Sequence, residues 1–195
     1  MNAAVLAHAD AFTSTPGPCP VIATERLFLR PHRLSDADAI ARSLSDFKVA
    51  RMLARVPQPY DRQDALDWLV LQASGLLPGW TVAITTNEDV HLGAVGLEHR
   101  GGQWHLGYWL NRFHWDRGYM TEAVAAVLER FFRRMPDTEV HAGAFADNLA
   151  SLNVQRKLGF RISGAGEMFS LARNRMVPLI ETTLRPEDFR SPSHP

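Results

Sequence analysis

Apolar residues recur along the chain either at every second position or at helical spacing, and the two patterns alternate. The period-two segments predict strands at 26–30, 80–86, 90–97, 103–110, 140–145, 160–163, 168–172 and 177–184. The helical segments predict helices near 35–47, 49–54, 61–73, 119–135 and 148–158. Because short turns join the three strands between 80 and 110, these strands should form an antiparallel meander.

Residue types at the segment ends indicate where the helices begin and end. Ser35, Asp61 and Asn148 each precede an amphipathic segment and are predicted to cap it. Pro136 ends the helix that begins at 119, and Gly159 ends the one that begins at 148. These signals predict one mixed sheet with helices on both faces.

The strand–helix–strand passage from 104 to 145 is the only clear parallel crossover in this pattern. Residues 1–20 are rich in Ala, Thr, Pro and Gly and are predicted to be a flexible N-terminal arm. We expect one α/β domain over residues 21–190, followed by a tail at 191–195.

Composition removes several classes of function. With 21 basic and 21 acidic residues in 195, the net charge is zero, which disfavours a broad nucleic-acid surface. No stretch approaches the length of a membrane span, and the N-terminus lacks the basic start of a signal peptide. Cys19 is the single cysteine, so a reducing, cytoplasmic location is expected. None of the eight histidines pairs at i, i+4 with a carboxylate on a predicted helix, so we expect no metal site.

The segment 115–123 has the features of an anion-binding turn. It follows the alternating residues 106–110 and opens the helix whose inner face carries Val124, Val127, Leu128 and Phe131. The main-chain N–H groups at 118–121 would have no partner inside that helix and would point at the positive end of its dipole. A phosphate or pyrophosphate is the expected ligand, although an ordinary strand-to-helix loop would have the same sequence features.

The order of motifs resembles the GNAT superfamily of acetyl-CoA-dependent N-acetyltransferases. The resemblance extends over 24–189 and includes an opening strand at 26–31, a central strand at 106–110 and the loop 115–120. Asn148-x-x-Ser151 followed by Lys157-Leu158-Gly159-Phe160 completes it. The branch that it most resembles contains the ribosomal-protein N-terminal acetyltransferases. This resemblance implies a GNAT fold with a splayed central strand pair, acetyl-CoA as cosubstrate and an amine acceptor.

The resemblance also implies cofactor-binding positions. The main chain of Tyr108, Trp109 and Leu110 would pair with the pantetheine arm in the gap beside strand 140–145. The pyrophosphate would lie on the loop Trp115, Asp116, Arg117, Gly118, Tyr119, Met120 and Thr121, in which Met120 replaces the small residue of the family. Asn148 and Ser151 would contact the cofactor as well.

Transfer of an acetyl group to an amine needs a base for the amine proton and a hydrogen bond for the leaving thiolate. His105 stands where relatives carry a glutamate base, with Glu98 and His99 as competitors. Ser151 is the candidate on the thiolate side. Many relatives use a tyrosine there, but the aromatic residues near Ser151 in sequence are Phe145 and Phe160. No cysteine lies near the site, which favours direct attack in a ternary complex.

The acceptor remains open at this level, between a peptide N-terminus and a small amine. The predicted helices at 35–54 and 61–73 carry several aspartates that would attract a cationic amine, or that serve as ordinary first-turn charges: Asp36, Asp38, Asp61, Asp64 and Asp67. A non-catalytic acyl-CoA-binding or interaction module is the alternative function, motivated by Met120 in the loop and by the absence of a tyrosine near Ser151 in the sequence. The assembly state is also open, with a homodimer as one candidate.

Overall fold

The computed structural model describes residues 15–76 and 78–191. Its centre is an eight-stranded sheet with the order β1-β2-β3-β4-β5-β6-β8-β7. The strands are β1 (Ile22–Ala23), β2 (Phe28–Pro31), β3 (Gly79–Thr85), β4 (His91–Arg100), β5 (Gln103–Leu110), β6 (Val140–Phe145), β7 (Arg161–Ser170) and β8 (Arg175–Leu184). Among the described strands only β5 and β6 pair in parallel, as the crossover between 104 and 145 predicts.

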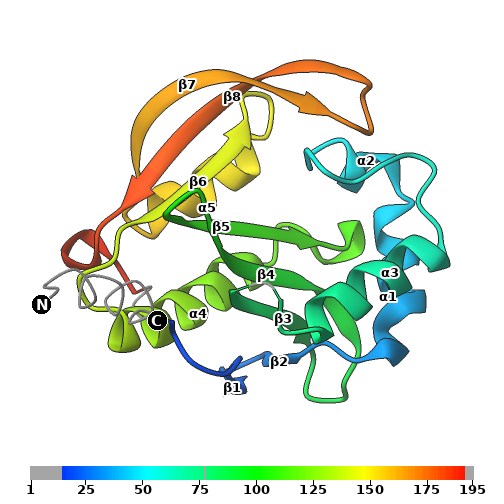
Figure 1. Cartoon of the computed structure of the whole chain (residues 1–195), viewed down its shortest axis with the longest axis horizontal. Helices are drawn as coiled ribbons and strands as arrows, with labels where there is room; N and C mark the ends of the chain where they lie inside the picture. The colour runs from blue at the N-terminus through cyan, green and yellow to red at the C-terminus, as the bar shows by residue number, and fades with distance from the viewer. Residues whose placement is uncertain (1–14, 77, 192–195) are drawn as a thin grey trace, which may run out of the picture.

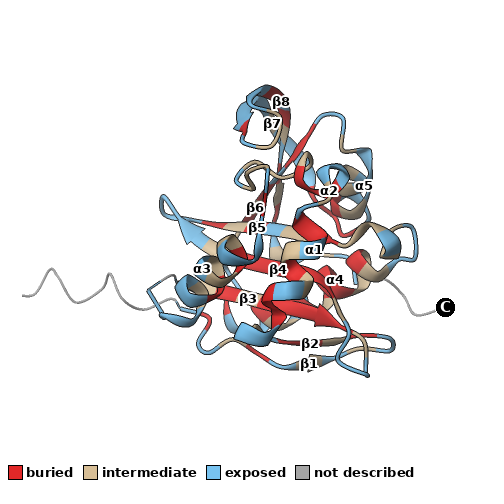
Figure 2. Cartoon of the chain, turned by 90° about the vertical axis from the view of Figure 1, so that its right-hand side faces the viewer, coloured by how far each residue is buried: buried red, intermediate tan, exposed pale blue. Residues whose placement is uncertain are grey.

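Helices cover both faces of the sheet, which confirms the predicted mixed architecture (Figure 1). They are α1 (Ala37–Leu44), α2 (Phe47–Ala50), α3 (Arg62–Ala73), α4 (Tyr119–Arg134) and α5 (Leu149–Lys157). The larger core joins α4 to the central strands, and a second core joins α1 and α3. Figure 2 shows the buried residues concentrated where β3 and β4 meet these helices. Within the described ranges no helix has the length and hydropathy needed to cross a membrane.

Side chains at the helix starts confirm two of the three predicted caps. Asp61 accepts hydrogen bonds from the main-chain N–H groups of Gln63 and Asp64, and Asn148 accepts one from Ser151. The prediction for Ser35 is wrong. A short 3-10 helix, η2 (Leu34–Asp36), precedes α1, and it is the Asp36 carboxylate that accepts from the main chain of Arg33.

The C-terminal hairpin departs from the predicted strands. One continuous strand, β7, stands in place of the two predicted segments 160–163 and 168–172, and it pairs with β8. Ser170 is the only buried residue of β7, so the strand has no inner face to impose an alternating pattern. This explains why the alternating apolar pattern is lost around Gly164–Gly166 and predicts two short strands instead of one.

The hairpin rises from the sheet as an arch, and its tip is held to the segment that follows α2 (Figure 1). The main-chain N–H of Leu171 donates to the Ala54 carbonyl. The buried Arg173 side chain donates to the Arg51 carbonyl and, through both terminal nitrogens, to the Asp147 carboxylate. Asp147 lies directly before the cap of α5. Arg173 therefore links the arch both to the segment after α2 and to the start of α5.

Residues 15–20, predicted as part of a flexible arm, contact the folded body. The Trp80 indole donates to the Gly17 carbonyl, and Arg134 donates to the carbonyls of Pro16 and Pro18. The packed part of the described chain therefore includes residues 16–18. The remainder of the predicted arm, 1–14, and the tail from 192 lie outside the described residues.

Candidate active site

Strands β5 and β6 separate after a short paired region. Their parallel register runs from Trp104 opposite Val140 to Leu106 opposite Ala142, and it stops there. Beyond it, β5 remains paired with β4 through Leu110 and β6 with β8 through Phe145. The facing main-chain edges of 107–110 and 143–145 are thus left without a strand partner on that side. This splayed edge is the one predicted to accept an extended, amide-bearing ligand.

The loop after β5 curls tightly before α4. Asp116 and Gly118 both adopt left-handed conformations, with φ of 59° and 78°. Gly118 is the N-cap of α4, and its carbonyl accepts the first helical hydrogen bond from Glu122. The N–H groups of the first helical turn therefore have no acceptor within the helix and face outward, beside the open end of the splayed strands.

An ion pair braces this loop from the side. The Arg26 side chain reaches Glu122 at 2.6 Å and donates to the Arg117 carbonyl at 3.0 Å. Its guanidinium also lies 4.8 Å from the ring centre of Tyr119. A Cβ atom on residue 118 would come within 3.3 Å of Arg26, so both the conformation and the packing favour glycine there.

The side chains of two predicted loop residues belong to the protein core. Met120 is 9% exposed and packs in the larger hydrophobic cluster, so it does not project over the first-turn N–H groups. Trp115 contacts both cores and donates its indole N–H to the Leu110 carbonyl at 2.8 Å. Because these two side chains pack in the core, the first-turn N–H groups of the loop are left uncovered by them.

Tyr108 and Ser151 meet between β5 and α5. The Tyr108 hydroxyl lies 2.9 Å from the Ser151 hydroxyl and 3.1 Å from the Ser151 carbonyl. Gln155 donates to the Ser151 hydroxyl and accepts from Thr182 on β8. Burial raises the pKa of Tyr108 to about 12, although its hydrogen bonds oppose this, so the phenol stays protonated at neutral pH.

The sequence pattern does not predict this contact. It assigns Tyr108 to the cofactor through its main chain and places no phenol near Ser151. Strand alternation contained the signal, because Tyr108 lies on the same face as Trp104 and Leu106, the face covered by α4 and α5. The Tyr108 hydroxyl therefore lies on the face of β5 that meets Ser151 in the first turn of α5.

The opposite face of the strands forms the floor of a cavity. Ala94, Gly96 and Glu98 of β4 lie opposite Trp109, Gly107 and His105 of β5, and all six line the cavity. The cross-strand pair of glycines leaves the middle of this floor without side chains. An added Cβ at Gly107 would meet no atom within 4 Å. The floor thus has a flat, open centre bordered by a tryptophan at one end and a polar group at the other.

His105 lies at the point where the two strands begin to separate. Its ring is half-buried and 5.6 Å from the ring of His141, its partner across the parallel pair. Burial lowers the pKa of His105, and the positive charges of Arg100 and His141 lower it further. A neutral imidazole at this position has a free lone pair and can accept a proton from a group on the cavity floor.

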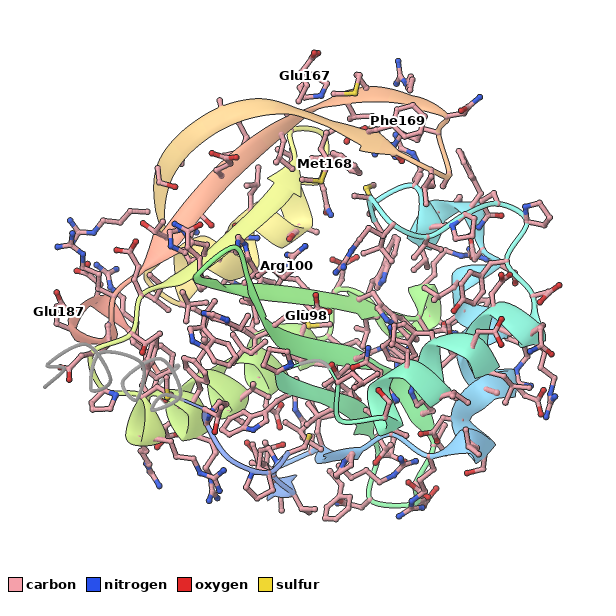
Figure 3. The ribbon with its side chains drawn as sticks, viewed as in Figure 1. Glu98, Arg100, Glu167, Met168, Phe169 and Glu187 are labelled. Carbon is pink, nitrogen blue, oxygen red and sulfur yellow. The ribbon has the colours of Figure 1, made fainter. Side chains whose placement is uncertain are left out.

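The two competing bases differ in their surroundings. Glu98 also borders the floor, but its carboxylate is paired with Arg55 at 2.9 Å and with Arg100 at 3.6 Å. His99 is exposed and its ring lies 5.1 Å from that of Trp104, on the face covered by α4. Figure 3 shows Glu98 and Arg100 at the centre of the molecule, under the arch, whereas Glu167 projects outward from β7.

The cavity is about 2010 Å³ in volume and extends from the α4 loop to the underside of the arch. Asn148 and Ser151 line it from α5, and Met168 lines it from β7. Every residue predicted for cofactor contact or catalysis also borders this one space: His105, Tyr108, Trp109, Leu110, Trp115, Asp116, Arg117, Gly118, Tyr119, Met120, Thr121, Asn148 and Ser151. The fold therefore brings the predicted set together.

The aspartates proposed to attract a cationic acceptor have other partners. Asp36 is buried against Arg30, and Asp38 pairs with Arg62. Asp61 caps α3, and Asp67 accepts from Gln63. Only one aspartate of the predicted set, Asp64, lines the cavity. The aspartates at 36, 38, 61 and 67 are thus structural charges.

Three comparisons with known proteins agree with this geometry. The Acetyltransferase (GNAT) domain matches residues 26–161. An uncharacterized N-acetyltransferase of Bacillus licheniformis, p20, is 25% identical over 173 residues, covering 85% of this chain and 96% of that protein.

Solved structures share the fold at lower identity. The ribosomal-protein-S5-alanine acetyltransferase from Vibrio fischeri is 20% identical, with a TM-score of 0.72 over 88% of this chain and 99% of the other. RimJ from Mycobacterium smegmatis in complex with CoA-disulfide is 19% identical, with a TM-score of 0.69 over 87% and 89%. Because the domain match spans well over half of the sequence, this protein belongs to the GNAT acetyltransferase family.

Proposed function

We propose that the protein transfers an acetyl group from acetyl-CoA to the primary amine of an acceptor, by direct attack while both are bound. The observation that carries this proposal is the splayed edge of β5 and β6 leading into the first turn of α4. The pyrophosphate would lie on the N–H groups at 118–121, and the pantetheine amides would pair with the main chain at 108–110. The thioester would then reach the start of the splay, near His105.

On the acceptor side, the cavity floor positions the amine. The flat centre at Gly96 and Gly107 gives the approaching chain room beside the thioester. His105 removes the proton that the attacking nitrogen must lose, and it passes that proton to solvent. A neutral imidazole suits this role without further tuning, while Glu98 is engaged by two guanidinium groups.

On the cofactor side, Tyr108 and Ser151 stabilise the leaving thiolate by hydrogen bonding. With a pKa of about 12, the phenol holds its proton more tightly than a thiol of pKa about 8.5. Complete transfer of that proton would be uphill by roughly 5 kcal/mol, so Tyr108 acts as a hydrogen-bond donor. Ser151 holds the phenol in position.

For the acceptor we infer a peptide or protein N-terminus, in keeping with the ribosomal-protein branch. The support is the size of the cavity and the name of one structural neighbour, a ribosomal-protein-S5-alanine acetyltransferase. Small amines are the competing class. The alternative of a non-catalytic acyl-CoA-binding or interaction module rests on Met120 in the loop and on the absence of a tyrosine near Ser151 in the sequence. The burial of Met120 and the contact between the Tyr108 and Ser151 hydroxyls both count against it.

A screen of acceptors tests this proposal. Peptides with different N-terminal residues, polyamines, amino acids and aminoglycosides would each be incubated with acetyl-CoA, with thiol release as the readout and product mass as confirmation. We expect release above the hydrolysis background with at least one peptide. Binding of acetyl-CoA without transfer to any member of the panel would favour the non-catalytic module instead.

A further inference from the structure

Two buried histidines lie outside the cavity described above. Among the buried side-chain nitrogen and oxygen atoms of the described residues, the ring nitrogens of His32 and His91 are the only ones without a hydrogen-bond partner. The His32 side chain is 3% exposed. Buried polar groups are nearly always hydrogen-bonded, because an unpaired one costs about 1–3 kcal/mol. Four unpaired ring nitrogens on two neighbouring histidines indicate that a binding partner for these rings is missing.

The two rings converge on a carboxylate. His32 follows β2, Asp36 ends η2, and His91 begins β4. One ligand atom from each lies within 4.8 Å of the others, and His32 Nδ1 is 3.7 Å from Asp36 Oδ2. Two imidazoles and a carboxylate are a ligand set of zinc and similar divalent ions. Ligands of one such ion lie at most about 4 Å apart, so small rotations of the two imidazole rings would close the site.

The charges around the cluster balance. Arg30 donates to both oxygens of Asp36 and to Asp89, and the exposed Arg33 pairs with the other oxygen of Asp89. Two guanidinium groups against two carboxylates leave no net charge to repel a cation. The same contacts fix the orientation of the Asp36 carboxylate, as outer-shell partners of metal ligands do.

We propose that His32, His91 and Asp36 form a binding site for a divalent transition-metal ion such as Zn²⁺. The ion would join η2 to the start of β4. Its ligands contact two tryptophans of the acceptor cavity, because the His32 ring lies 4.9 Å from Trp68 and the His91 ring 5.7 Å from Trp109. The site would therefore support one wall of the cavity from behind, in a structural role. The spacing of histidines along the sequence predicts no metal site. This is because His91 comes from a distant segment and meets the other two residues only in the folded chain.

Cobalt gives the most direct test, since Co²⁺ bound to imidazole and carboxylate ligands absorbs visible light. Protein freed of metal with a chelator would be titrated with Co²⁺ by absorbance and with Zn²⁺ by calorimetry. We expect one equivalent of each, and a rise in melting temperature with Zn²⁺. His91→Leu and His32→Leu, which keep an apolar group in the core, should each weaken Zn²⁺ affinity by at least about 100-fold.

The other neighbouring histidine pair provides a matched control. His105 and His141 are 5.6 Å apart between ring centres, so the double variant His105→Ala/His141→Ala removes the same number of imidazoles from a partly exposed place. This double variant should still bind one metal ion per protein molecule. Failure of the wild-type protein to bind either ion, or undiminished binding by folded His91→Leu, would overturn the proposal. Loss of binding only in the His105/His141 double variant would also overturn it.

Discussion

The Tyr108 hydroxyl lies 2.9 Å from the Ser151 hydroxyl, which joins the splayed strand β5 to the first turn of α5. This contact links the two segments to which the sequence assigns the cofactor. It also brings a protonated phenol next to Ser151, although no tyrosine lies near Ser151 in the sequence.

Tyr108→Phe removes the proposed donor to the thiolate while keeping the ring. We expect kcat to fall about 10- to 100-fold, since a hydrogen bond to a charged group contributes about 1.5–3 kcal/mol. The dissociation constant for acetyl-CoA should change little, because its main-chain contacts remain. Tyr60→Phe is the matched control, since Tyr60 is a buried tyrosine that lines the same cavity on the side of α3. Equal losses in the two variants would argue against a role for Tyr108 in the transfer.

His105→Ala tests the base through the pH profile. Burial, with help from Arg100 and His141, lowers the pKa of His105 below its ordinary value of 6.5. In the proposed role only the neutral form accepts the amine proton, so kcat/KM should fall as the pH drops through that lowered pKa. In His105→Ala this acidic limb should disappear and the plateau should drop by about 10²- to 10⁴-fold.

His99→Ala is the control for this measurement, because His99 is exposed on the other face of the sheet against Trp104. It should retain both the plateau and the limb. Activity close to wild type in His105→Ala would move the role to Glu98 or to a bound water.

Gly118→Ala tests the anion-binding loop. The new side chain must adopt a left-handed conformation and meets Arg26, so the free energy of unfolding should fall by about 1 kcal/mol. Gly101→Ala imposes a similar conformation, with φ of 56°, in the β4–β5 turn where nothing lies within 4 Å. Both variants should lose stability, but only Gly118→Ala should bind coenzyme A more weakly in calorimetry. Equal coenzyme A affinity in both folded variants would contradict the loop assignment.

Gly107→Leu tests the acceptor floor. Residue 107 is exposed, and an added side chain there meets no atom within 4 Å, so the variant should fold. The leucine would fill the flat centre of the floor, raising KM for the acceptor while leaving acetyl-CoA affinity near wild type. Gly166→Leu on β7, equally open but outside the cavity, is the control and should leave both constants unchanged. An unchanged acceptor KM in Gly107→Leu would place the acceptor elsewhere.

Most of the helices and strands could be predicted from local signals in the sequence. The apolar pattern predicted β6 to the residue, and the periodicity of α4 and the caps Asp61 and Asn148 were confirmed. Where burial imposed no pattern, as along the exposed β7, the sequence misplaced the strand. Ser35 has the residue type of a cap, but the chain forms the short helix η2 there, and Asp36 accepts from the main chain of Arg33 and from Arg30 on β2.

The site was predictable to the extent that its parts are contiguous. The loop 115–121 and the Asn148–Ser151 turn are continuous segments with helix-terminus chemistry, so sequence could identify them. The pairing of Gly96 with Gly107 follows from the register that the two-residue turn at 101–102 sets, so the sequence contains a signal for it. The meeting of His32 with His91 depends on tertiary packing and has no signal in local spacing.

A structure of the wild-type protein with acetyl-CoA bound measures the central claim most directly. We predict that the pyrophosphate oxygens accept hydrogen bonds from the main-chain N–H groups at 118–121, and that the pantetheine amides pair with β5 at 108–110. The thioester sulfur should lie within hydrogen-bond reach of Tyr108. A cofactor bound outside the splay between β5 and β6, or one whose sulfur lies away from Tyr108 and His105, would contradict the account.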